Sequence, residues 1–167
     1  MSGKTRTEHD LLGDKEVPVE ALYGVQTLRC VENFDISKDY LCEYPEFTKA
    51  LGIVKMAAVL SNHELGLIDD KIKDAIVAAC KELMEGEHLE HFPIDMVQGG
   101  AGTSVNMNAN EVIANRALEI MGKKRGQYKY CSPNDHVNMS QSTNDAYPTA
   151  MHIGLYLTHF HVREALL

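Results

Sequence analysis

The 167-residue chain carries a formal net charge of −8 and 44% hydrophobic residues, values typical of a soluble globular protein with one domain, or one domain and part of a second. The acidic balance argues against a nucleic-acid partner, because phosphate contacts need clustered Lys and Arg. No run approaches the roughly 20 apolar residues that span a bilayer. Residues 1–13 lack the apolar core of a signal peptide, so we expect a cytoplasmic protein without membrane contact.

The cysteines lack the spacing of a metal site and the density of a disulfide-rich secreted domain. They are Cys30, Cys42, Cys80 and Cys131. We expect reduced thiols at all of these positions.

The first 40 residues alternate short apolar pieces with Gly, Pro and charged residues. Pro18 and Gly24 interrupt any strand in this region. The pattern predicts extended chain with a small hairpin.

Helical periodicity begins at Pro45, a residue that suits the first turn of a helix, and Gly66 is a plausible end. The apolar face of this helix is predicted to hold Phe47, Ala50, Leu51, Val54, Ala57 and Ala58. A second helix is capped by Asp69 or Asp70 and ends at Gly86. Its apolar stripe comprises Ile72, Ala75, Ile76, Ala79, Cys80 and Leu83. Two antiparallel helices are expected.

A third helix is predicted from about Ser104 to Met121, with Gly122 beyond it. Its buried face comprises Val105, Ala109, Val112, Ile113, Ala117 and Ile120. Asparagines are costly inside a helix, so those of this segment predict a polar surface with specific hydrogen-bond partners. They are Asn106, Asn108, Asn110 and Asn115.

The last segment, from about Asp145 to Leu167, is apolar around most of its circumference, as in an interior helix of a bundle. Pro148 fits its first turn. The sequence stops at Leu167 without a helix-ending signal, which predicts a fragment cut within a helix.

The stretch from Gly99 to Asn108 joins a glycine loop to a helix start. Gly99, Gly100 and Gly102 allow close approach of a ligand, and Thr103 or Ser104 supplies an N-cap hydroxyl that could turn to a bound anion. A nucleotide loop is disfavoured by the spacing, since no third glycine of that motif and no Gly-Lys-Ser/Thr occurs. A loop that only connects two elements remains an alternative.

The second stretch runs from Ser132 to Asn138 and on to Asp145. Ser142, Thr143 and Asn144 place three neutral donors directly before a helix, where an ordinary N-cap is the alternative. Two helix N-termini with exposed N–H groups, brought together, form a site for a carboxylate.

The histidines give no convincing metal-ligand set, so no metal is expected. His88 and His91 lie in an acidic stretch, and His159 and His161 do not share a helix face. His136 is interpreted as a hydrogen-bonded structural residue rather than a base.

In the order of its motifs the chain resembles the aspartase/fumarase superfamily over nearly its whole length, from Asp10-Leu11-Leu12-Gly13 to Pro148-Thr149-Ala150. The resemblance implies a mainly α fold with a small hairpin. Residues 1–139 would form the N-terminal lyase domain, and residues 140–167 the first helix of a truncated central bundle.

Three departures from the class II fumarase pattern favour the aspartase branch. The first motif reads Thr103-Ser104-Val105 where fumarases typically read Thr-Gln-Thr, and the second reads Ser142-Thr143 where they read Ser-Ser. Ser132 replaces the histidine of the fumarase secondary dicarboxylate site.

The resemblance implies reversible elimination of ammonia from L-aspartate to give fumarate, with no organic cofactor and with divalent-cation activation left open. It assigns Ser142 and Thr143 as donors to the β-carboxylate, and Thr103 and Asn144 as partners of the amino group or nearby polar atoms. The general base of the superfamily is a serine in a loop signature that this sequence lacks. No catalytic residue is therefore expected in the chain, which would be inactive alone and part of a homotetramer when complete. The alternatives are a class II fumarase and a non-catalytic dicarboxylate-binding module.

Overall fold

The computed structural model describes residues 3–167 and begins with the expected hairpin. Strands β1 (Thr5–Asp10) and β2 (Gly13–Pro18) pair antiparallel, with Thr5 opposite Pro18 and Asp10 opposite Gly13. Gly13 has a φ of +106°, which a glycine adopts without a steric cost. The predicted small hairpin is confirmed.

Helix α1 (Val25–Asn33) contradicts the prediction of extended chain over the rest of the first 40 residues. Its N-cap, Gly24, offers no side chain. Glu111 instead accepts hydrogen bonds from the backbone N–H groups of Gly24 and Thr27, at 2.9 and 3.0 Å. Because this cap comes from a residue 87 positions away, no local pattern announces the helix.

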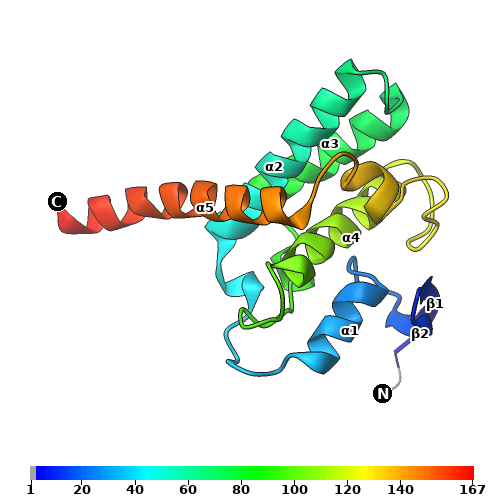
Figure 1. Ribbon diagram of the computed structural model, residues 1–167, viewed down its shortest axis with the longest axis horizontal. Coiled ribbons are helices and arrows are strands. Elements are labelled where there is room, and N and C mark those ends of the chain that lie inside the picture. Colours follow the sequence, from blue (N-terminus) through cyan, green and yellow to red (C-terminus); the bar gives the residue numbers. More distant parts are fainter. Residues whose placement is uncertain (1–2) are drawn as a thin grey trace.

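Helices α2 (Pro45–Glu64) and α3 (Asp70–Met84) form the expected antiparallel pair (Figure 1). The cap of α3 is Asp69, whose Oδ1 accepts the Ile72 N–H at 2.9 Å. The predicted stripe of α3 is buried except for Ile72, which is half-buried. The prediction for α2 is partly wrong, because Ala57 is exposed and Lys55 is buried.

Helix α4 (Thr103–Ile120) lies at the centre of the body, between α1 and the α2–α3 pair (Figure 1). Every residue from Val105 to Asn115 is buried. The prediction that the asparagines form a polar surface is therefore wrong. The prediction that they have specific hydrogen-bond partners is confirmed. Ile120, predicted to be buried, is 41% exposed because it lies at the end of the helix.

The chain between the main helices contains three short turns, η1 (Leu41–Glu43), η2 (Leu89–His91) and the π-helical η3 (Pro133–Val137). Helix α5 (Thr143–Leu166) then starts against α2 and extends away from the body (Figure 1). Its buried residues are Ala146, Ala150 and Gly154.

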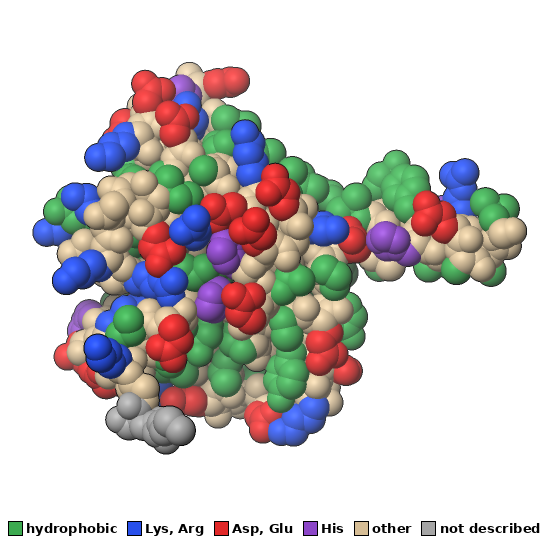
Figure 2. All heavy atoms as spheres, turned by 180° about the vertical axis from the view of Figure 1, so that it is seen from behind, with side chains coloured by type: hydrophobic (Ala, Val, Ile, Leu, Met, Phe, Trp, Pro, Cys, Tyr) green, Lys and Arg blue, Asp and Glu red, His purple; other side chains and the backbone are tan. Residues whose placement is uncertain are grey.

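The sequence predicts an interior helix here, but within residues 3–167 no residue of α5 beyond Gly154 is buried. Figure 2 shows hydrophobic side chains along this projecting segment, whereas charged side chains are spread over the body. Its exposed large apolar residues are Leu155, Tyr156, Phe160, Val162 and Leu166. Across residues 3–167, no helix combines the length and the apolar character needed to cross a membrane.

Candidate functional site

The structure brings the two sequence motifs into contact. Asn106, in the first turn of α4, donates from Nδ2 to Oγ1 of Thr143 at 3.3 Å. Gly102 lies against the ring of Tyr147, so that a Cβ atom at Gly102 would stand 2.3 Å from the ring. The starts of α4 and α5 are therefore neighbours, as a shared anion site requires.

A cavity of about 450 Å³ lies between the glycine loop and the first turn of α5. Its lining residues are Met96, Gln98, Gly100, Ala101, Gly102, Asn144, Tyr147 and Pro148. Of the predicted site residues, Asn144 lines this cavity directly. Thr103, Ser142 and Thr143 adjoin it in sequence, and Thr103 and Ser142 are exposed.

The hydroxyl groups of Ser142 and Thr143 accept intramolecular hydrogen bonds. Oγ of Ser142 accepts the Asn144 N–H at 3.2 Å, and Asp145 completes a capping box by accepting the Ser142 N–H at 2.9 Å. Oγ1 of Thr143 accepts from Asn106. A hydroxyl that accepts in this way keeps its own hydrogen for a ligand oxygen. The predicted N-cap at α5 is confirmed.

The predicted cap of α4 is wrong. Neither Thr103 nor Ser104 caps the helix, whose N-cap is Gly102, with a φ of +83°. The Val105 N–H donates instead to Oε1 of Gln98 at 3.1 Å, across the glycine loop. Gln98 thus caps the helix in place of the hydroxyl group that the sequence predicted.

A buried lysine lies beneath the contact between the motifs. Lys55 of α2 is 0% exposed, and its Nζ donates to Oδ1 of Asn106 at 2.7 Å, to Oδ1 of Asn138 at 3.0 Å and to Oε1 of Gln141 at 2.9 Å. Burial lowers the pKa of Lys55 to about 7. Its three amide partners come from α4 and from the segment that leads into α5.

Sequence reasoning missed Lys55, Gln98, Asn138 and Gln141. One signal was available for the lysine, because Lys55 stands four residues after Leu51 and four before Val59, on the buried face of α2. Gln98, Asn138 and Gln141 are half-buried polar residues in loops, where no periodicity marks a residue that bonds to the interior.

His136 has the structural role that was predicted. Its Nδ1 accepts the Ser132 N–H at 2.8 Å, which closes the turn at η3. A separate group lies near η2, where potential metal-ligand atoms of His88, Glu90 and His91 are within 4.8 Å of one another. His88 is already paired with Glu82 at 2.8 Å, and Glu82 also binds Arg116.

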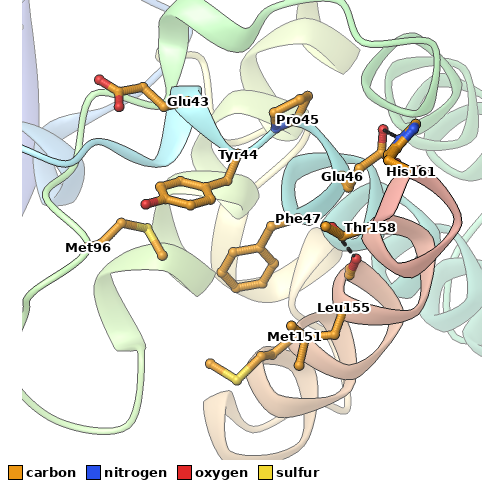
Figure 3. Close-up of a pocket in the computed structure, with 11 residues that line it drawn as sticks. Glu43, Tyr44, Pro45, Glu46, Phe47, Met96, Met151, Leu155, Thr158 and His161 are labelled. Atoms are coloured by element: carbon orange, nitrogen blue, oxygen red, sulfur yellow. Dashed lines mark hydrogen bonds and ion pairs between the residues drawn. The ribbon is translucent and has the colours of Figure 1, made fainter. Parts of the chain in front are cut away.

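A second, more apolar cavity of about 460 Å³ lies where the start of α2 meets α5. Figure 3 shows Tyr44 and Phe47 between Met96 on one side and Met151 and Leu155 on the other. Its lining offers few polar groups, apart from the Glu46 carboxylate, which lies 3.4 Å from Nε2 of His161. A small dicarboxylate therefore fits the glycine-loop cavity better than this one.

Comparisons with known proteins identify relatives of this chain. Among curated proteins, the aspartate ammonia-lyase of Helicobacter pylori is 58% identical over 151 residues, which cover 90% of this chain and 32% of that protein. The aspartate ammonia-lyase of Escherichia coli is 51% identical over 167 residues, covering 99% and 35%. The chain thus spans about a third of the length of these curated relatives.

Solved structures of related proteins match the fold of this chain. A fumarate lyase:delta crystallin from Brucella melitensis, bound to cobalt, matches with a TM-score of 0.96 and 52% identity, over 98% of this chain and 35% of that one. A class II fumarase from Schistosoma mansoni matches with a TM-score of 0.81 and 39% identity, over 91% and 32%. The expected mainly helical fold with a small hairpin is confirmed.

A family model described as lyase matches residues 13–166, nearly the whole chain. The resemblance drawn from the motifs is confirmed by this match and by the relatives above, and the chain belongs to the lyase family.

Proposed function

We propose that the chain supplies the carboxylate-binding and amine-binding part of an aspartate ammonia-lyase, which reversibly removes ammonia from L-aspartate to give fumarate. The observation that carries the proposal is the contact between Asn106 and Thr143, which places the two donor-rich helix starts side by side. The names of the relatives support the choice of substrate.

The chemistry explains why donors belong there. Removing the Cβ proton of L-aspartate leaves a second negative charge on the adjacent carboxylate, so groups fixed around that carboxylate stabilise the transition state. Ser142 and Thr143 are proposed as these donors, because each hydroxyl accepts an intramolecular bond and keeps its hydrogen. Thr103 and Asn144 are proposed to hold the amino group or nearby polar atoms.

The general base is proposed to lie outside these 167 residues, since the sequence holds no Gly-Ser-Ser-x-x-Met-Pro stretch. The chain alone is therefore expected to be inactive, and the complete protein is proposed to act as a homotetramer. No organic cofactor is proposed, and divalent-cation activation would be a property of the complete enzyme.

The test is Ser142→Ala in the complete protein, compared with Asp69→Ala. Each change removes an N-cap and should lower the free energy of unfolding by about 1 kcal/mol. Only Ser142→Ala should also lower kcat for fumarate formation, by a factor of about 100. Equal turnover in the two variants would refute the role of Ser142.

A class II fumarase is the second candidate, favoured by the match to the Schistosoma mansoni enzyme. The complete protein can be assayed with fumarate plus ammonia and with fumarate in water alone. Formation of L-aspartate supports the ammonia-lyase, and formation of malate supports the fumarase. Binding of fumarate without either reaction would point to a non-catalytic module.

A further inference from the structure

The start of α4 is stabilised in an unusual way. The first N–H groups of a helix lack intrahelical acceptors, and a hydroxyl or carboxylate at the N-cap normally satisfies one of them. Asp69 does this for α3, and Ser142 does it for α5. Helix α4 has a glycine at this position and takes its cap from Gln98, seven residues before Val105.

The cap from Gln98 leaves the first hydroxyl of the helix unused. Within residues 3–167, the Thr103 side chain has no hydrogen-bond partner, and it is exposed beside the glycine loop. Ser104 instead lines a separate cavity, together with Cys30 and Phe34. Thr103 is therefore the hydroxyl of this helix start that can turn to a ligand.

Gln98 is itself held in place. Its Nε2 donates to the backbone oxygen of Asp95 at 3.5 Å. Asp95 is 1% exposed, and its carboxylate accepts the N–H groups of Ile36, Ser37 and Val97 at 2.7–2.8 Å. The side chain that caps α4 is thus hydrogen-bonded to Asp95, whose carboxylate is buried. The same Gln98 side chain lines the cavity beside the glycine loop.

We propose that Gln98 is a positioning residue of the dicarboxylate site: it caps α4 across the glycine loop and so leaves the Thr103 hydroxyl free to donate to a substrate oxygen. This inference rests on the proposed function. A neutral amide suits the task, because a glutamate would cap the helix equally well but would place a negative charge in the lining of an anion cavity.

The test measures fumarate binding by calorimetry in the complete protein, because fumarate is a ligand in both the ammonia-lyase and the fumarase reaction. The variants are Gln98→Ala and Gln98→Glu, each with and without Thr103→Val. The control is Gln127→Glu, since Oε1 of Gln127 also accepts a backbone N–H, from Lys124 at 3.1 Å, outside this cavity.

Gln98→Glu should weaken fumarate binding about tenfold with only a small loss of melting temperature, because the carboxylate still accepts the Val105 N–H but no longer donates to Asp95. Gln127→Glu should leave binding unchanged. Gln98→Ala should weaken binding by a similar factor, because the Thr103 hydroxyl turns inward to cap the helix. In the Thr103→Val background, Gln98→Ala should then have no further effect on binding.

Wild-type affinity in both single Gln98 variants, or additive effects of Gln98→Ala and Thr103→Val, would overturn the role of Gln98 while leaving the proposed function intact. Failure of the wild-type protein itself to bind fumarate would overturn the proposed function, and this inference with it.

Discussion

Nζ of Lys55 lies 2.7 Å from Oδ1 of Asn106, and Nδ2 of the same asparagine lies 3.3 Å from Oγ1 of Thr143. A side chain of α2 is thereby connected, through one amide of α4, to a hydroxyl at the start of α5. The amide can bond in both directions because it carries an acceptor and a donor. The relative position of the two donor-rich motifs therefore depends on the buried lysine.

Replacing Lys55 by Met should lower the free energy of unfolding by about 3 kcal/mol, because buried amide oxygens lose their donor. Lys49→Met is the matched control in the same helix, since Lys49 is partly exposed and pairs with Glu46 at 2.9 Å. Urea denaturation measures both values. A loss no larger than that of the control would contradict the role assigned to Lys55.

The pH dependence of stability follows from the same residue. The pKa of Lys55 is lowered from 10.5 to about 7 by burial, so between these values the unfolded chain binds more protons than the folded one. Stability should therefore rise from pH 7 to pH 8.5, by at most about 1.4 kcal/mol per pH unit. In Lys55→Met this rise should be absent, which denaturation at each pH will show. Above this range a thiol has the opposite effect on stability. Burial raises the pKa of Cys80 to about 12, so near pH 9 the unfolded chain loses the thiol proton while the folded chain keeps it, and stability falls.

Gly102→Ala should be far more damaging than Gly122→Ala. Both glycines have a left-handed φ, +83° and +70°, so both alanines would be strained to a similar degree. Only at Gly102 would the added Cβ meet an obstacle, the Tyr147 ring at 2.3 Å, whereas nothing lies within 4 Å of a Cβ at Gly122.

The difference between the two variants in the free energy of unfolding should be at least about 1 kcal/mol. Tyr147→Ala should remove most of that difference in the double variant, because it removes the ring. Purely additive effects of Gly102→Ala and Tyr147→Ala would show that the ring is not the obstacle.

Those parts of the fold that local chemistry determines could be predicted from the sequence. Asp69 caps α3 through an amide three residues away, and Pro45 begins α2 where its missing N–H costs nothing. Ser142 and Asp145 form a capping box within four residues. Each of these signals can be recognised without knowing what else the chain packs against.

The parts that were missed depend on partners far away in the sequence. The cap of α1 comes from Glu111, and the amide partners of Lys55 lie 51 to 86 residues away. Periodicity treats Asn106 and Asn115 as polar and therefore exposed, although both are buried and tertiary hydrogen bonds satisfy both ends of each side-chain amide. The adjacency of the two motifs was predicted from their chemistry, but the residues that hold them together were not.

The last prediction concerns Glu111, which is 2% exposed and accepts from the backbone of Gly24, Gln26 and Thr27 and from the Thr27 hydroxyl at 2.6 Å. Glu111→Gln keeps the shape but turns one acceptor into a donor that faces these N–H groups, so the free energy of unfolding should fall by about 2 kcal/mol. Glu85→Gln, at an exposed position of similar charge, should change it little. Amide hydrogen exchange should quicken at Thr27 more than in the centre of α4, because the loss falls first on the start of α1. Unchanged exchange at Thr27 would mean that α1 does not depend on this carboxylate.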